Sequence, residues 1–490
     1  MEIARGILTT IFAIVAWPML LYFLVINTSY LVLIGLASTN FAAYLRRTFF
    51  SGERAVAGSP LSLGISVVMP AYNEEMVITT SVRSVLDLRY PDHEVIVVND
   101  GSKDATLQKL IETFSLELDA REVPERIPVR GALRGVWRSN DPAIPLTVVD
   151  KENSGRSDSL NAGINISAKD LVVMVDADSL IDPDALLTVS KPFADDPENV
   201  VATGGVVRAV NGCRVSAGRV VQVGMPKEMV ARIQVVEYLR AFLLGRTGWS
   251  QLKALILISG AFGMFRRDVL LEAGGLDPDC IGEDFELVMR IHKKMIDSKR
   301  RYRVVFVAEP VSWTEVPPNL TVLARQRRRW HRGLWEVLSQ YRGMTLNPRY
   351  GRVGMIALPF YWLFELIAPA LELSGLILVP LGLWLGLVDP HYALLLLLVS
   401  YVYAIFVSLV ALVVEEASFH RYTKWRDLWA CILAAVVENF GYRQLTAIWR
   451  LQGWWAALRG SAAEWGTMTR TGFSDERDAA VTAAEERLSR

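Results

Sequence analysis

The sequence has few cysteines and no excess of charge of either sign. Its 490 residues include only three cysteines, and 52 Lys and Arg residues balance 52 Asp and Glu residues. Cys213, Cys280 and Cys431 lack the spacing of zinc ligands or of a disulfide framework, and they fit a reducing, cytoplasmic setting for the soluble part. Because the chain also lacks the basic field that attracts nucleic acid, we expect no nucleic-acid partner.

Hydrophobic residues are abundant, at 52% of the chain and a mean hydropathy of +0.27. They collect at residues 7–45 and again after Val353, whereas the middle of the chain has the pattern of a soluble α/β domain. A soluble enzyme with an adhesive surface is the alternative, but the length of the apolar segments argues against it.

The first apolar segment, Gly6–Leu45, contains no charged residue, and about 20 apolar residues are enough to cross a bilayer. It is too long for a cleaved signal peptide. Polar residues 27–29 interrupt it, so a kinked helix and an interfacial piece plus one span are both open, and we favour one span. Arg46, Arg47 and Arg54 follow, which places the downstream end in the cytoplasm.

The second apolar region contains two stretches without Asp, Glu, Lys or Arg, at residues 373–388 and 390–414. The turn between them, at Asp389, has no positive charge, whereas the loop at 420–426 has three cations. We therefore expect Asp389 outside and the loop inside. Residues 428–437 have cations on both sides, which favours an interfacial or tucked helix over another span.

These patterns predict a multi-pass protein of the plasma membrane with about three spans. Its predicted parts are an N-terminal transmembrane segment (1–51), a cytoplasmic domain (52–346), a C-terminal membrane region of transmembrane and interfacial helices (347–460) and a cytoplasmic tail (461–490).

The middle block alternates short apolar runs with helical patterns. Strands are predicted at residues 65–69, 94–98, 146–149 and 171–175, with a helix at 76–88. This alternation is typical of a mostly parallel sheet with both faces covered, in which ligands bind beyond the carboxyl ends of the strands. The arginine-rich stretch between Glu117 and Pro145 is predicted to be a surface insertion, either a solvated loop, which we favour, or a contact with membrane phosphates.

Pairs of carboxylates lie at the end of one predicted strand and at the start of one predicted helix. Asp176 and Asp178 leave the strand at 171–175 on the same side and suit a hard divalent cation, although a solvated turn has the same pattern. Glu283 and Asp284 begin a predicted helix. One interpretation is that these acids only stabilise the start of the helix through its dipole. The other is that Asp284 is a general base that takes the proton of an acceptor hydroxyl.

Two further strand ends carry polar side chains. Asp100 ends the strand at 94–98 and suits hydrogen bonds from a nucleotide base or ribose, but the segment 99–102 is also a good turn sequence. Tyr72, in the segment 70–74, is either a packed aromatic or a side chain that stacks on a base.

A basic motif, Gln326-Arg-Arg-Arg-Trp330, precedes the second membrane region. For Arg327 and Arg328 we favour contact with lipid head groups. Arg329 suits a leaving diphosphate, and Trp330 suits a sugar ring or an interfacial position.

The order of these motifs resembles the signature of processive family 2 glycosyltransferases, the group of cellulose, hyaluronan, chitin and poly-N-acetylglucosamine synthases. The motifs are Asp100, Asp176-x-Asp178, Glu283-Asp284 and Gln326-x-x-Arg329-Trp330. The resemblance spans residues 65–338 and implies a GT-A nucleotide-sugar domain, with a mostly parallel mixed sheet, inserted between α-helical transmembrane segments. It also implies an inverting transfer that depends on Mg²⁺ or Mn²⁺.

The resemblance implies a role for each motif. The implied sets are Tyr72, Glu74 and Asp100 around the base and ribose, Asp176 and Asp178 at the metal, Asp284 as the catalytic base with Glu283 beside it, and Gln326, Arg329 and Trp330 at the diphosphate and acceptor end. Residues 259–263 resemble the small-residue loop beside the acceptor. In place of the Gly-Lys-Ala of many relatives the chain has Gly155-Arg156-Ser157, and Arg156 is expected to contact the nucleotide, although its planar fork binds phosphate differently from Lys.

The predicted function is transfer of a sugar from a nucleotide donor, UDP-linked in the family, to a growing polysaccharide. The alternative is a non-processive transferase that acts on a lipid or short acceptor, since about three spans leave little material for a channel. A transporter or receptor with a nucleotide-binding domain would need polar groups within its spans and a Gly-x-x-x-x-Gly-Lys-[Ser/Thr] loop. The sequence shows neither in a convincing form.

Overall fold

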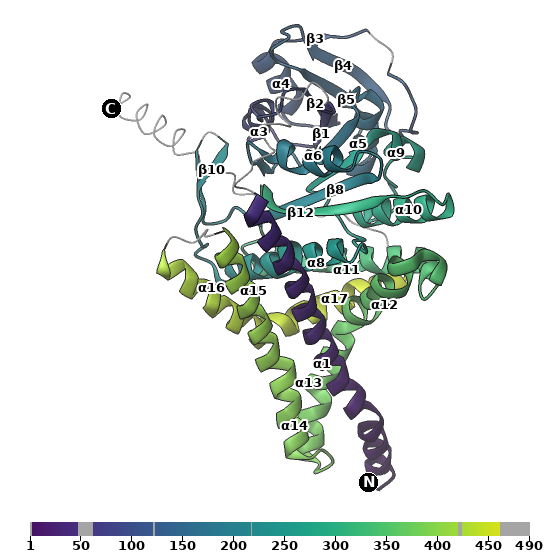
Figure 1. Cartoon of the computed structure of the whole chain (residues 1–490), viewed down its shortest axis with the longest axis vertical. Coiled ribbons are helices and arrows are strands. Elements are labelled where there is room, and N and C mark those ends of the chain that lie inside the picture. Colours follow the sequence, from purple (N-terminus) through teal and green to yellow (C-terminus); the bar gives the residue numbers. More distant parts are fainter. Residues whose placement is uncertain (1, 48–61, 121–122, 217, 420–423, 461–490) are drawn as a thin grey trace. The chain divides into compact units, whose positions relative to one another are not determined.

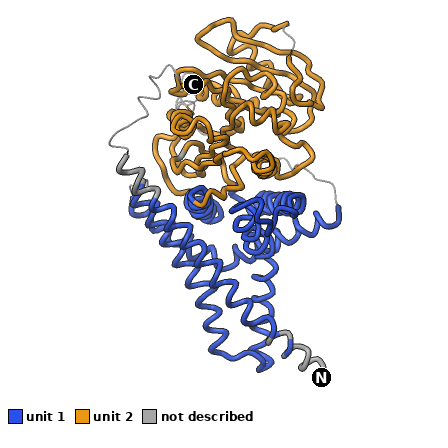
Figure 2. Tube along the Cα trace, turned by 45° about the vertical axis from the view of Figure 1, so that its right-hand side comes forward, with its two compact units in different colours: residues 1–43, 227–251, 317–466 blue, residues 44–226, 252–316, 467–490 orange. Residues whose placement is uncertain are grey.

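The computed structural model describes residues 2–47, 62–120, 123–216, 218–419 and 424–460 (Figure 1). The predicted tail (461–490) and Arg54 lie outside the described residues. The chain forms two compact units, coloured separately in Figure 2. Unit 1 comprises Met1–Ala43, Lys227–Gln251 and Pro317–Gly466, and unit 2 comprises Tyr44–Pro226, Leu252–Val316 and Thr467–Arg490. The predicted boundaries at residues 51, 346 and 460 concern the membrane and remain predictions.

Unit 2 is built on a sheet that has ten strands within the described residues, in the order β3-β4-β5-β2-β1-β6-β11-β8-β12-β7. The strands are β1 (Ile65–Ala71), β2 (His93–Asp100), β3 (Leu116–Leu118), β4 (Leu133–Ser139), β5 (Leu146–Lys151), β6 (Leu171–Val175), β7 (Leu180–Ile181), β8 (Val200–Ala209), β11 (Phe262–Arg266) and β12 (Arg303–Thr314). β9 (Arg214–Ser216) and β10 (Arg219–Gln222) form a separate antiparallel pair. Only β4, β7 and β11 oppose the common direction, which confirms the predicted mostly parallel mixed sheet.

Helices follow the strands of unit 2 and protect their apolar side chains from water. They are α3 (Ile78–Leu86), α4 (Thr106–Phe114), α5 (Arg156–Ile166), α6 (Ala185–Asp195), α9 (Arg267–Ala273) and α10 (Glu283–Asp297). The whole of β6 is buried, as its uninterrupted apolar sequence requires. α5 approaches β1 so closely that a Cβ on Gly163 would lie 2.3 Å from Val68. All four predicted strands are confirmed.

The prediction of a solvated loop between residues 117 and 145 is wrong for two segments. β4 pairs antiparallel with β5, and β3 pairs with β4 to form the edge of the sheet. An edge strand needs a backbone partner rather than an apolar sequence, so exposed arginines do not prevent it from forming. Leu118 and Leu133 are exposed at this edge.

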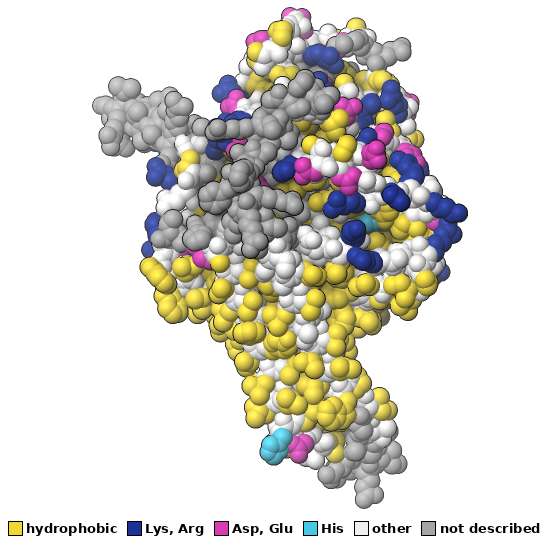
Figure 3. All heavy atoms as spheres, viewed as in Figure 1, with side chains coloured by type: hydrophobic (Ala, Val, Ile, Leu, Met, Phe, Trp, Pro, Cys, Tyr) yellow, Lys and Arg dark blue, Asp and Glu magenta, His cyan; other side chains and the backbone are white. Residues whose placement is uncertain are grey.

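Unit 1 is helical. Its elements are α1 (Glu2–Arg47), α7 (Met229–Tyr238), η2 (Leu239–Gly245), α8 (Arg246–Gln251), α11 (Leu320–Gln340), η3 (Arg342–Met344), η4 (Pro348–Tyr350), η5 (Val353–Ala357), α12 (Leu358–Phe360), η6 (Tyr361–Leu366), α13 (Ala368–Trp384), α14 (Pro390–Leu397), η7 (Leu398–Val402), α15 (Tyr403–Phe419), α16 (Trp425–Val437), η8 (Glu438–Tyr442) and α17 (Arg443–Leu458). Among the described residues, three stretches are long and apolar enough to cross a membrane: Ile14–Thr39, Val353–Trp384 and Pro390–Ser418. Figure 3 shows hydrophobic side chains over much of the visible surface of these helices.

The polar residues of the first apolar segment do not interrupt its helix, because α1 is continuous through them. Asn27 Nδ2 donates to the Val399 carbonyl over 2.8 Å, and the Thr28 hydroxyl lies 3.1 Å from the Tyr403 hydroxyl. Their hydrogen bonds are therefore made with the third apolar stretch rather than by breaking the helix.

The second apolar stretch contains acids that pair with arginines of α17. Glu372 lies 2.6 Å from Arg443, and Glu365 lies 3.5 Å from Arg450 and accepts from the Tyr30 hydroxyl over 3.1 Å. Such pairing offsets the cost of charge among apolar helices. Both acids lie within the second apolar stretch and precede its uncharged part, which begins at residue 373.

Candidate active site

The candidate site lies in unit 2, where neighbouring parallel strands end. Asp100 is the last residue of β2, and Asp176 follows β6 directly. Arg156 begins α5, which follows β5. Because β5, β2, β1 and β6 are adjacent and parallel, their carboxyl ends bring these side chains to the same edge of the sheet.

Tyr72 and Glu74 lie just beyond β1 at this edge. Tyr72 is 43% exposed, and the amide of Glu74 donates to Thr106 Oγ1 over 2.9 Å. Asn73 between them has φ +56°, a left-handed conformation that asparagine tolerates. This turn leaves the ring of Tyr72 accessible rather than packed.

Asp100 is buried, and both of its carboxylate oxygens accept hydrogen bonds from the chain. Oδ1 accepts from Lys151 Nζ over 2.7 Å and from the Ser154 amide over 3.0 Å. Oδ2 accepts from the Gly155 amide over 2.9 Å. Asp100 therefore holds the loop that leads into α5, and its predicted contact with a nucleotide stays a prediction.

Sequence reasoning missed Lys151, which is fully buried at the end of β5. Its ammonium lies between Asp100 and Asp158, 3.1 Å from Asp158 Oδ2, and also donates to Ser154 Oγ. Burial alone would raise the pKa of Asp158, but hydrogen bonds, first from Ser154 and then from the backbone of residues 130 and 131, lower it. The sequence feature that could have identified Lys151 is a charged residue close after an apolar run that predicts a buried strand.

Arg156 joins three elements of the site. Its Nε and Nη2 donate to Asp176 Oδ1 over 2.9 and 2.7 Å, and its Nη1 donates to Glu283 Oε1 over 3.0 Å. Nη2 also donates to the Gly260 carbonyl over 2.7 Å. Burial disfavours the charged guanidinium, but the carboxylates of Asp176 and Glu283 outweigh it and raise the pKa of Arg156.

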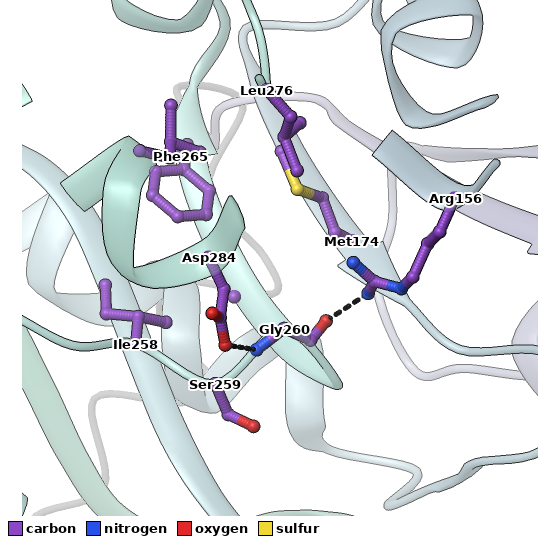
Figure 4. A pocket seen from close by; sticks show the side chains of 10 residues that line it. Arg156, Met174, Ile258, Ser259, Gly260, Phe265, Leu276 and Asp284 are labelled. Carbon is purple, nitrogen blue, oxygen red and sulfur yellow. Dashed lines mark hydrogen bonds between the residues drawn. The ribbon is translucent and has the colours of Figure 1, made fainter. Parts of the chain in front are cut away.

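Asp284 lines a small pocket beside Arg156 (Figure 4). Its Oδ2 accepts from the Gly260 amide over 2.9 Å, and its Oδ1 accepts from the Phe285 amide over 2.8 Å. The remaining lining is mostly apolar and comprises Met174, Ile258, Ser259, Gly263, Phe265, Leu276 and Leu287. Asp284 lies in the first turn of α10, as predicted, where the helix dipole favours a carboxylate.

The carboxylates of the site can hold a divalent cation only if the substrate supplies further oxygen ligands. Within the described ranges, no group of three or more His, Cys, Asp or Glu side chains is placed to hold a metal ion. A magnesium-type ion is often held by one or two carboxylates together with substrate phosphates. Asp176, whose side chain is 33% exposed, and Asp178 are the carboxylates predicted for this role, and their contact with a metal stays a prediction.

The Gln326-Trp330 motif lies on α11 and belongs to unit 1. Gln326 is buried, and Trp330 is 38% exposed with the Arg327 guanidinium 4.8 Å from the centre of its ring. Arg327 forms an ion pair with Glu237. The favoured contact of Arg327 with lipid head groups is therefore wrong, because the protein itself supplies the partner.

Two family models match the chain. The model described as "Glycosyl transferase family 2" matches residues 66–124, and the one described as "Glycosyl transferase family group 2" matches residues 171–414. The chain belongs to the family 2 glycosyltransferases. Together with the sheet described above, this membership confirms the GT-A-type fold that the resemblance implied.

The relatives are polysaccharide synthases by name. The chain is 29% identical over 278 residues to poly-beta-1,6-N-acetyl-D-glucosamine synthase of Staphylococcus aureus (strain COL), an alignment that covers 56% of this chain and 55% of the relative. Identity to the synthase of the same name from Staphylococcus epidermidis is 27% over 275 residues, with the same coverage. The chain thus spans about half the length of the curated relatives it matches. A solved structure, mannosyltransferase PcManGT from Pyrobaculum calidifontis in complex with GDP-Man and Mn²⁺, is 19% identical and covers 84% of this chain and 99% of its own, with a TM-score of 0.47.

Proposed function

We propose that the protein is a membrane-bound, inverting glycosyltransferase that moves a sugar from a UDP-linked donor to the end of a growing polysaccharide. One observation carries this function: Asp284, at the start of α10, faces a pocket that also contains Arg156, whose guanidinium holds the strand-end carboxylate Asp176. This arrangement supports a base close to the donor side of the site. The names of the relatives, which are synthases of a poly-N-acetylglucosamine, support the polymer as product.

Asp284 is the general base in this proposal. It takes the proton from the acceptor hydroxyl as the acceptor oxygen bonds to the anomeric carbon and the bond from that carbon to the diphosphate breaks. The attack is opposite the leaving group, so the anomeric centre inverts. Glu283 supports the site through its ion pair with Arg156.

The other predicted residues surround the donor and acceptor. Tyr72, Glu74 and Asp100 are assigned to the base and ribose, Asp176 and Asp178 to the metal, and Gln326, Arg329 and Trp330 to the diphosphate and the acceptor end. When bound, Mg²⁺ or Mn²⁺ would stabilise the negative charge of the leaving nucleoside diphosphate.

The domain at 52–346 is assigned to the cytoplasm, and the protein to the plasma membrane with several spans. The three apolar stretches and the arginines at 46 and 47 support this assignment. The second candidate is a non-processive transfer to a lipid or short acceptor. The same apolar helices favour it, because they would keep the domain close to a lipid acceptor.

The test uses the purified full-length chain in detergent or nanodiscs with a panel of nucleotide sugars, Mg²⁺ or Mn²⁺, and membranes as acceptor. We expect UDP release and a product of high mass on a gel. Asp284→Asn should lower the rate by about 10²- to 10⁴-fold, whereas Asp297→Asn, at the other end of α10, should not. A short product would favour the second candidate. Release of nucleotide from none of the donors would contradict both.

A further inference from the structure

Arg156 has more partners within the chain than a residue reserved for the donor requires. It begins α5, and its guanidinium makes four hydrogen bonds to three acceptors: one in the first turn of α10, one in the loop after β6 and one in the loop before β11. A guanidinium has five N–H donors in a fixed plane. Most of its capacity is therefore already used by Asp176, Glu283 and the Gly260 carbonyl.

We propose that Arg156 is a positioning residue that links the donor-side carboxylate Asp176 to the base Asp284 through the backbone of Gly260. This role rests on the proposed function and replaces the direct nucleotide contact that the sequence predicts for Arg156.

Gly260 is the intermediate in this link. Its carbonyl accepts from Arg156 Nη2, and its own amide donates to Asp284 Oδ2 (Figure 4). The two groups lie on neighbouring peptide planes that share the Cα of Gly260, so a displacement of Gly260 as a whole alters both hydrogen bonds. A Cβ on Gly260 would lie 3.4 Å from Asp284 Oδ2 and 3.5 Å from the Arg156 guanidinium, so the three residues are in close contact.

Arg156 also has an electrostatic role, because it compensates the negative charge of neighbouring carboxylates. Asp176 and Glu283 both face its guanidinium, and with Asp284 they place three acids around one cation. Without the cation, the acids would repel one another and move apart. The first turn of α10 carries Glu283 as well as Asp284, so this repulsion would displace the base.

A lysine would not replace Arg156. Its ammonium is a compact charge without the planar fork, so it cannot hold the three acceptors in the same directions. Arg156→Lys should therefore keep the charge of the site and lose the geometry.

The kinetic test compares Arg156→Ala and Arg156→Lys with Arg266→Lys, which changes a partly exposed arginine that bonds the Pro197 carbonyl outside the pocket. We expect kcat to fall about 10²-fold in both Arg156 variants, as for a misplaced catalytic group. The donor KM should change less than about 3-fold if Arg156 does not touch the nucleotide. Millimolar methylguanidinium should restore part of the activity of Arg156→Ala. A large rise in donor KM at constant kcat would overturn the proposal and assign Arg156 to the nucleotide, and an unchanged kcat would also overturn it.

A second measurement does not depend on activity. Deuterium exchange of a peptide that contains residues 258–263 reports on the Gly260 amide, which Asp284 protects. Exchange should be faster in Arg156→Ala and unchanged in Arg266→Lys, with the unfolding temperature followed in each. Unchanged exchange in Arg156→Ala would overturn the link even in an active chain. Faster exchange in a chain that releases no nucleotide would retain the link and reject the proposed function instead.

Discussion

Lys151 Nζ lies 2.7 Å from Asp100 Oδ1, and their side chains are only 0% and 6% exposed. The pair joins the ends of β2 and β5, and Asp158 of α5 completes it from a third element. A buried cation between two carboxylates therefore holds the loop that positions Arg156. In the proposed function, residues that stabilise the fold and residues that act in catalysis therefore lie at the same edge of the sheet.

Lys151→Met should destabilise unit 2 by about 3–5 kcal/mol, because it leaves Asp100 and Asp158 buried without their cation. Denaturant unfolding of the purified chain measures this change. Lys191→Met is the matched control, since Lys191 forms an exposed pair with Asp195 within one helix, and it should cost less than about 1 kcal/mol. An equal loss of unfolding free energy in the two variants would show that the buried cluster contributes no more to stability than an exposed ion pair.

Asp178→Asn should raise the concentration of Mn²⁺ or Mg²⁺ needed for half-maximal activity by about 10-fold or more, because it removes the charge of a proposed oxygen ligand. Chelation with EDTA should abolish activity, and added Mn²⁺ should restore it. Asp141→Asn, in an exposed turn, should leave the metal titration unchanged. Full activity in EDTA would contradict the assignment of a metal to Asp176 and Asp178.

His292 should make stability depend on pH between about 4 and 6.5. Its Nε2 donates to the Leu255 carbonyl over 2.8 Å, and Nδ1 accepts from the Tyr302 hydroxyl over 2.7 Å. Burial lowers the pKa of His292 to about 4, from 6.5, despite the hydrogen bond to Leu255. The unfolded chain then binds more protons in this window, so stability is full above pH 6.5 and falls as the pH drops toward 4.

Thermal unfolding of the full-length chain at pH 4.5, 5.5 and 7 tests this dependence. In His292→Gln, the loss of stability toward low pH should be smaller than in the unmodified chain, by on the order of 3 kcal/mol. The exposed His391 provides the control, and His391→Gln should leave the pH dependence unchanged. The same pH dependence in His292→Gln and the unmodified chain would exclude this role.

Glu237 should stabilise the protein through its ion pair with Arg327, which lies on α11, the helix that carries Trp330. Glu237→Gln leaves the mostly buried Arg327 without its carboxylate, and we expect a loss of roughly 2 kcal/mol, between the values for exposed and buried pairs. Tyr442→Phe removes only one hydrogen bond of 2.9 Å to Glu237, and should cost about 1 kcal/mol. Thermal unfolding in detergent gives both values, and the reverse order would contradict this account of the cluster.

Much of the fold could be predicted because its signals are local. Uninterrupted apolar runs predicted β1, β2, β5 and β6, and long uncharged segments predicted the apolar helices. β4, which lies next to the edge strand β3, was missed, because its pairing with β5 depends on a backbone partner rather than on its own side chains. Arg327 was misinterpreted for a similar reason, since Glu237 is 90 residues away in the chain.

By itself, the sequence determined where the acids stand: Asp100 and Asp176 at strand ends and Asp284 at a helix start, since strand and helix periods set these positions locally. Only the tertiary structure decided which charges meet. Lys151 reaches Asp100 across 51 residues, and Arg156 reaches Glu283 across 127. Such pairings depend on strand order and on the burial of particular side chains, which no local pattern encodes. The order of the strands therefore converts separate motifs into one site.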